Sequence, residues 1–229
     1  MLSTLRTLAF RDISNWALTG GLAVEIHYQS RGCAPTDRPF NDLDFVTSGF
    51  DCIPTSLADD YLRNHIHPLD PPGKTILQLI DSNTSIRVDV FRAFGATMSR
   101  DNYLELWHLP IFLISLEDLV ARAARLVLDL AVGQPVASKH AKDYLRLAEL
   151  VDLVRVETPW QDQRRSTHPV TFQEANALLP ALIPRQSDLL VTPEYAKDPL
   201  VRASCPRCLP SPPFQLAEPA EVLSLLRYC

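Results

Sequence analysis

The stretch from Thr19 to Thr47 constrains the fold more than any other part of this 229-residue chain. Its sequence is TGGLAVEIHY, then a polar loop, then RPFNDLDFVT, and it sets two of the chain's seven glycines side by side. An apolar WALT precedes the glycines, and Gly and Pro in RGCAPTDRP separate the helical pattern from the apolar DLDFVT. The order strand, Gly-Gly turn, helix, loop, strand predicts an α/β fold.

The flanking segments complete that prediction. Leucines at three-residue spacing predict a helix from Leu2 to about Ile13. The β-rich runs KTILQLID and SIRVDVFRAF are joined by polar turn residues and predict an antiparallel hairpin. Ser115, followed three residues later by Asp118, is typical of a capped helix start. We expect helices over 116–131 and 138–154 after a small mixed sheet flanked by helices.

Three carboxylates fall on the predicted strands. Asp42 and Asp44 stand two residues apart, so both side chains leave the same face of their strand. Asp89 lies opposite the valines of its own strand and can supply a third carboxylate to that face. Carboxylates held this close repel one another unless a cation lies between them. Hard oxygen ligands on a rigid sheet suit Mg²⁺, although each aspartate alone is also typical of a solvated strand.

The glycine pair supplies a second half to such a site. Gly20 and Gly21 carry no Cβ, so the backbone can approach a phosphate at the start of the following helix. A Gly-Gly turn alone is ordinary loop punctuation. A phosphate-facing turn beside a carboxylate cluster, however, is what phosphoryl or nucleotidyl transfer requires.

Composition excludes some classes of protein. The formal charge of −5 argues against a surface built for non-specific binding of nucleic acid. No apolar run approaches the length of a membrane helix, and the N-terminus lacks the pattern of a signal peptide, so we expect a cytoplasmic protein with no membrane partner. Five cysteines in a chain of this size indicate reduced thiols or a metal site rather than structural disulfides.

Taken together, these residues resemble the nucleotidyltransferase superfamily, whose fold is shared with DNA polymerase β. The family pattern is a helix-opening Gly-Gly or Gly-Ser, an acidic-x-acidic strand and a later acidic strand residue. GGLAVEIHY…TDRPFNDLDF is similar to the small bacterial branch that contains AbiEii-type toxins and antibiotic nucleotidyltransferases. SLEDLVARAARLVLDL…SKHAKDYLRLAEL extends the similarity to a helix with a Lys-Asp pair, Lys142 and Asp143.

The resemblance implies roles for individual residues. Asp42, Asp44 and Asp89 would bind Mg²⁺, with Asp89 helping to deprotonate the acceptor hydroxyl. The nucleotide-binding residues would be Thr19, Gly20, Gly21, Arg38 and Lys142. Asp143 would orient the triphosphate or the acceptor. From spacing alone, the stripe that contains Lys142 and Asp143 is equally well explained as a solvated helix face.

The resemblance also implies the partners. The expected reaction transfers a nucleoside monophosphate from an NTP to RNA, such as a tRNA end, or to protein, as in a toxin with a cognate antitoxin. One alternative is a small-molecule nucleotidyltransferase of the aminoglycoside or lincosamide type. The other is a non-catalytic nucleotide-binding protein of the same fold.

Residues 156–229 form a predicted Pro-rich C-terminal appendage, since eleven of the nineteen prolines lie beyond Arg155. Cys205 and Cys208 have C-x-x-C spacing, and with Cys229 they are candidate ligands of a structural Zn²⁺, His168 being the nearest fourth. Free thiols are the other interpretation. We therefore expect a catalytic core over 1–110, a helical subdomain over 111–155 and this appendage.

Overall fold

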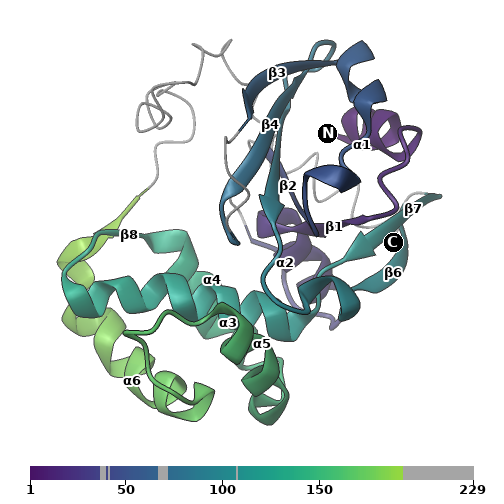
Figure 1. Ribbon diagram of the computed structural model, residues 1–229. Helices are drawn as coiled ribbons and strands as arrows, with labels where there is room; N and C mark the ends of the chain where they lie inside the picture. Colours follow the sequence, from purple (N-terminus) through teal and green to yellow (C-terminus); the bar gives the residue numbers. More distant parts are fainter. Residues whose placement is uncertain (37–39, 41, 67–71, 107, 193–229) are drawn as a thin grey trace. The chain divides into compact units, whose positions relative to one another are not determined.

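A seven-stranded mixed sheet organises the N-terminal part of the computed structural model, which describes residues 1–36, 40, 42–66, 72–106 and 108–192 (Figure 1). Across the sheet the strand order is β3-β4-β5-β2-β1-β7-β6. The strands are β1 (Trp16–Thr19), β2 (Asp42–Thr47), β3 (Tyr61–Ile66), β4 (Thr75–Asp81), β5 (Arg87–Arg92), β6 (Asn102–Leu106) and β7 (Leu109–Leu113). The prediction of a mixed α/β fold is confirmed.

The strand that carries two of the aspartates, β2, lies inside the sheet. It pairs antiparallel with β1 on one side and parallel with β5 on the other. The β4–β5 hairpin expected from the sequence is present and antiparallel. Because both edges of β2 are hydrogen-bonded to neighbouring strands, its backbone is held on both sides, and its side chains have fixed neighbours on β1 and on β5.

The alternation of side chains separates an apolar face from the carboxylate face. Leu43, Phe45, Val88 and Val90 of β2 and β5 are completely buried on the apolar face. Burial of each such side chain stabilises the fold by about 1.5 to 3 kcal/mol. With a side-chain period of two, this burial forces the residues between them, including the aspartates, onto the opposite face.

Two α-helices belong to the same part of the chain, α1 (Leu2–Ala9) and α2 (Gly20–Gln29). The first helix was expected to reach Ile13 but ends at Ala9, and the left-handed backbone of Asp12 (φ 56°) excludes a helix that continues to Ile13. The second begins at the glycine pair itself, directly after β1, and packs against β1 and β2. The Gly-Gly turn is therefore the N-terminus of a helix that lies along the aspartate strand.

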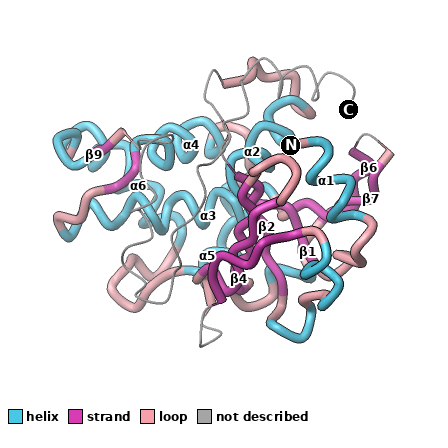
Figure 2. The backbone as a smooth tube through the Cα atoms, turned by 90° about the horizontal axis from the view of Figure 1, so that it is seen from above, coloured by secondary structure: helices cyan, strands magenta, loops and turns pink. Residues whose placement is uncertain are grey.

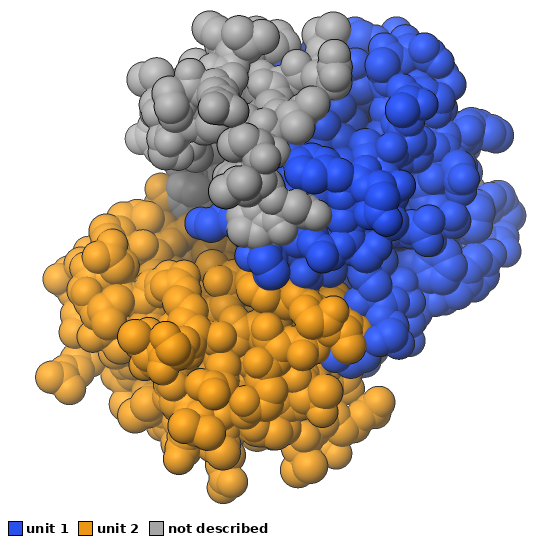
Figure 3. Space-filling view, in the orientation of Figure 1, with its two compact units in different colours: residues 1–93, 98–114, 194–229 blue, residues 94–97, 115–193 orange. Residues whose placement is uncertain are grey.

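The described chain divides into two compact units, one of residues 1–93 and 98–114 and one of residues 94–97 and 115–192 (Figure 3). The second unit is mainly helical (Figure 2), with α3 packing against the other three helices. Its elements are α3 (Leu116–Val127), α4 (Ser138–Ala148), α5 (Glu157–Gln163), α6 (Phe172–Arg185) and the short paired strands β8 (Val136–Ala137) and β9 (Leu190–Val191). The subdomain boundaries expected at 110 and 155 stay a prediction.

Local signals explain where these helices begin and end. The Ser115 hydroxyl accepts a hydrogen bond from the Asp118 backbone N–H, as the sequence predicted for the start of α3. The helix expected over 138–154 ends earlier, at Ala148. Asp152 instead caps a separate helical turn by accepting from the Val154 N–H at 3.0 Å, which starts a new element. No helix in the described residues is both long and apolar enough to cross a membrane.

Candidate metal and phosphate site

Three carboxylates meet on one face of the sheet. Asp42 and Asp44 are two residues apart on β2, and Asp44 lies directly opposite Asp89 of β5. One oxygen from each of the three groups lies within 4.8 Å of the others. Parallel pairing of adjacent strands produces this closeness, because residues opposite each other in the register are separated by about 5 Å. The structure thus brings together the three aspartates that the sequence singled out, and their metal-binding role stays a prediction.

Gly20 is required by the aspartate strand. Thr19, the last residue of β1, is opposite Asp44 in the register, so the chain turns into α2 immediately beside that carboxylate. Gly20 has a left-handed φ of 68°, and a Cβ built on it would overlap the Asp44 carboxylate. The first-turn N–H groups of α2, which no helical carbonyl accepts, therefore start next to Asp44. Turn and carboxylate form one local structure.

A guanidinium group lies among the carboxylates. Arg87, two residues before Asp89 on β5, faces the same side of the sheet and forms an ion pair with Asp42 Oδ2 through its NH2. Its Nε lies 3.0 Å from Asp89 Oδ2. Burial alone would lower the pKa of Arg87, but the charges of Asp89, Asp42 and Asp44 together raise that pKa above its ordinary value. The residue is a permanent cation in this site.

The other oxygen of Asp89 is held by an amide. Gln78 of β4 is buried and opposite Asp89 in the register, and its Nε2 donates to Asp89 Oδ1 at 2.5 Å. Asp89, itself 6% exposed, therefore contacts Gln78 of the neighbouring strand through one oxygen and Arg87 of its own strand through the other. Arg87 and Gln78 were not singled out from the sequence. The strict alternation of side chains along β5 could have predicted that Arg87 lies beside Asp89. The position of Gln78 could be predicted only from the register of the β4–β5 hairpin.

A buried glutamate anchors the loop that leads to β2. Glu25 of α2 is 1% exposed and accepts hydrogen bonds from the Thr36 N–H, at 3.0 Å, and from the Thr36 hydroxyl. A buried carboxylate is costly unless its oxygens are paired in this way. The contact anchors this loop at Thr36, six residues before Asp42.

The donor set fits a hard divalent cation. Three carboxylates supply oxygen ligands from a rigid sheet, the composition that Mg²⁺ prefers, and Mg²⁺ completes its shell with water or substrate phosphates. Formally the three carboxylates and Arg87 sum to −2, the charge that one divalent cation neutralises. The adjacent helix N-terminus can accept an anion. Chemically, the arrangement can hold a metal and a phosphate side by side.

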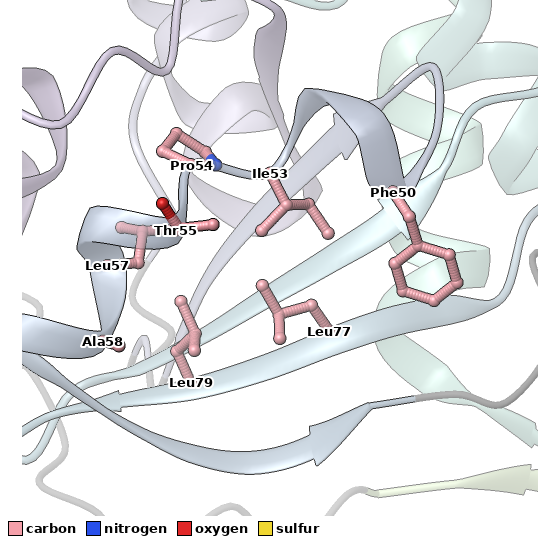
Figure 4. Close-up of a pocket in the computed structure, with 8 residues that line it drawn as sticks. All are labelled: Phe50, Ile53, Pro54, Thr55, Leu57, Ala58, Leu77 and Leu79. Atoms are coloured by element: carbon pink, nitrogen blue, oxygen red, sulfur yellow. The ribbon is translucent and has the colours of Figure 1, made fainter.

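An apolar cavity of about 400 Å³ lies on the opposite face of the sheet (Figure 4). Leu77 and Leu79 of β4 line it together with Ile53 and Phe50, and they alternate with Gln78, which points toward Asp89. The lining contains no charged side chain. This cavity is separate from the three carboxylates, and its lining is almost entirely apolar.

The remaining predicted site residues lie in the helical unit or outside the described residues. Lys142 on α4 is exposed, whereas its neighbour Asp143 is buried. The two residues therefore do not form a fully solvated stripe. The role of Lys142 and Asp143 in nucleotide binding stays a prediction. Arg38 is outside the described residues.

The predicted zinc ligands Cys205, Cys208 and Cys229 are likewise outside the described residues. His168, the guessed fourth ligand, stacks on Trp160 with ring centroids 5.8 Å apart. Burial and neighbouring arginines lower the pKa of His168, which favours the neutral form of the ring. Against the described residues, His168 therefore packs as a structural side chain.

Comparison with protein-family models gives no match, and comparison with curated proteins gives none either. Among solved structures, the chain is similar to the crystal structure of an antigenic nucleotidyltransferase-like protein from Paracoccidioides brasiliensis. The two are 17% identical with a TM-score of 0.47, over 83% of this chain and 93% of that one. A likeness at this level assigns neither a family nor a chemistry to the chain.

Proposed function

We propose that the protein is a Mg²⁺-dependent nucleotidyltransferase that transfers a nucleoside monophosphate from an NTP to an acceptor hydroxyl. The observation that carries this proposal is the cluster of Asp42, Asp44 and Asp89 directly beside the Gly20 turn. Nucleotidyl transfer needs metal ligands next to a phosphate-binding backbone, and these two features share one strand junction here. We expect the protein to act in the cytoplasm, where NTPs are available.

The proposed roles follow from the chemistry of the residues. Asp42, Asp44 and Asp89 hold Mg²⁺, which when bound neutralises charge on the phosphate oxygens. The amides after Thr19, at Gly20 and Gly21, face the triphosphate. The Asp89 carboxylate accepts the proton of the acceptor hydroxyl, whose oxygen bonds to the α-phosphorus. The bond from that phosphorus to the bridging oxygen breaks, and pyrophosphate leaves.

Lys142 and Asp143 have supporting roles in this proposal. Lys142 supplies a positive charge to the triphosphate, as Arg38 does before β2, and Asp143 orients the triphosphate or the acceptor. We expect Lys142→Ala to weaken NTP binding, measured by equilibrium dialysis. Lys139→Ala, one turn earlier on α4, is the matched control on the same helix.

The test of the enzyme measures pyrophosphate release and transfer of label from NTPs with and without millimolar Mg²⁺. We expect Asp42→Ala to lower the rate about 100-fold or more, because it removes a metal ligand. Asp51→Asn, an exposed acidic residue of the same unit, is the control and should keep the wild-type rate. Failure of the wild-type protein to bind any NTP in millimolar Mg²⁺ would refute the proposal.

The acceptor class is tested in the same experiment. RNA, including tRNA, or a protein is the leading acceptor, and a protein partner that blocks the reaction would be a cognate antitoxin. The alternative acceptors are aminoglycoside-like or lincosamide-like small molecules. Label on RNA, on protein or on a small molecule separates these outcomes, and NTP binding without turnover would identify a non-catalytic nucleotide-binding protein.

A further inference from the structure

Arg87 occupies oxygen atoms that a metal would use. The guanidinium pairs with Oδ2 of Asp42 and lies 3.0 Å from Oδ2 of Asp89, so it spans the two strands that carry the ligands. Its side chain is only 15% exposed. Screening by water is weak for a pair this buried, so the contacts are stronger than those of a surface ion pair.

The contacts of Asp89 also limit which of its oxygens a metal can reach. Gln78 already donates to Oδ1 of Asp89, so the other oxygen is the one that Arg87 approaches. A divalent cation entering the cluster therefore meets a positive charge at both Asp42 and Asp89. A metal cation and the Arg87 guanidinium repel each other strongly when both contact the same carboxylates at a partly buried site.

We propose that Arg87 is a resident counterion that competes with the divalent metal for Asp42 and Asp89 and keeps the affinity for free metal low. When no substrate is present the carboxylates repel one another, and Arg87 offsets one of their three negative charges without a metal. Mg²⁺ then enters favourably together with the phosphates of the nucleotide, whose negative charge offsets the guanidinium. This inference rests on the proposed function and makes Arg87 a positioning residue of that site.

The experiment titrates nucleotide-free protein with Mn²⁺, a spectroscopic substitute for Mg²⁺, and measures affinity by calorimetry and by the electron paramagnetic resonance of free Mn²⁺. Arg87→Met removes the charge and keeps an unbranched side chain. We expect it to bind Mn²⁺ about tenfold or more tightly than the wild type. Arg87→Lys keeps the charge as a compact ammonium that cannot span both carboxylates, so its affinity should lie between the two.

The matched control is Arg11→Met. Arg11 bridges two carboxylates of the same unit, Asp59 and Asp60, as Arg87 bridges Asp42 and Asp89. Loss of this other bridge should leave the Mn²⁺ affinity unchanged. A general loosening of the fold would instead alter the affinity in both methionine variants.

Mn²⁺ affinity that is equal or weaker in folded Arg87→Met and Arg87→Lys overturns the proposal. Loss of the fold in both variants, followed by circular dichroism, also overturns it, because Arg87 would then be a structural residue. No step of this titration contains a nucleotide. The order of metal affinities can therefore hold even if the protein transfers no nucleotide, and it can fail in an active enzyme.

Discussion

Replacing Gly20 with alanine tests whether the glycine turn and the metal strand are one structure. A Cβ at Gly20 would overlap the Asp44 carboxylate, and the backbone there is left-handed at φ 68°. The backbone conformation costs an alanine about 1 to 2 kcal/mol. Displacing Asp44 costs about 1 to 3 kcal/mol more, the usual range for overpacking. We expect Gly20→Ala to lower the free energy of unfolding by about 2 to 5 kcal/mol.

Gly32→Ala is the matched control. Gly32 has nearly the same φ, 71°, but a Cβ there has no heavy atom within 4 Å. The backbone cost and the lower entropy of the unfolded alanine chain are common to both variants, so their difference isolates the contact with Asp44. Asp44→Gly should relieve most of that difference, which a double-mutant cycle measures.

The assay is urea unfolding followed by the fluorescence of buried Trp16, with Trp107 and Trp160 replaced by phenylalanine so that only the sheet unit reports. Nucleotide-free Mn²⁺ binding is measured on the same proteins, and we expect Gly20→Ala to bind more weakly because Asp44 must move. If Gly20→Ala is no less stable than Gly32→Ala, the turn tolerates a side chain. The inference that Asp44 requires a glycine at position 20 is then wrong.

Three further changes test other parts of the structure. Asp118 is completely buried and accepts several hydrogen bonds, so Asp118→Ala should destabilise the helical unit by about 3 kcal/mol or more, measured by its urea midpoint. Burial lowers the pKa of His168, so its contribution to stability is complete above its ordinary pKa and is lost as the pH falls through the lowered value. His168→Phe, which keeps the stacking on Trp160, should remove that acid-side loss from melting curves at pH 7 to 5. Glu25→Gln should speed amide hydrogen exchange at Thr36 about tenfold or more, since it weakens a charge-assisted hydrogen bond, and unchanged exchange would contradict the anchoring role.

The local parts of the fold could be predicted from the sequence because short-range signals determine them. The period of two in DLDFVT fixes which residues share a face, and the glycine pair ends β1 and starts α2. Ser115 starts α3 through a contact three residues away. Each of these features depends on neighbours in the chain.

Strand order and register could not be predicted in the same way. The neighbour of β1 on one side is β7, whose Phe112 pairs with Ala17, and nothing local to either strand specifies that pairing. Gln78 meets Asp89 only because the β4–β5 hairpin has one particular register, with an irregularity near Thr75. A shift of one residue would move Gln78 to the other face and replace it with leucine. Long-range packing of the apolar face selects the register.

Arg87 shows where a pattern was informative but incomplete. Its position two residues before Asp89 indicates a shared face, yet the sequence does not say whether an arginine at such a place points to solvent or to the carboxylates. The parallel pairing of β2 with β5 decides this, because it puts Arg87 opposite Asp42. The same pairing that assembles the acidic cluster therefore necessarily adds a cation to it.

The features of the site constrain one another through β2. On one side Asp44 is opposite Thr19, and its carboxylate leaves no room for a Cβ on the next residue, Gly20. On the other side Asp44 is opposite Asp89, which sets the position of the third carboxylate. A longer acid at position 44 would extend into the space that Gly20 leaves open, and a side chain at position 20 would push Asp44 toward Asp89. Because both edges of β2 are paired, the strand cannot shift to absorb either change. The backbone of three adjacent strands therefore sets the spacing between the α2 N-terminus and the carboxylates, which in the proposed function is the spacing between phosphate and metal.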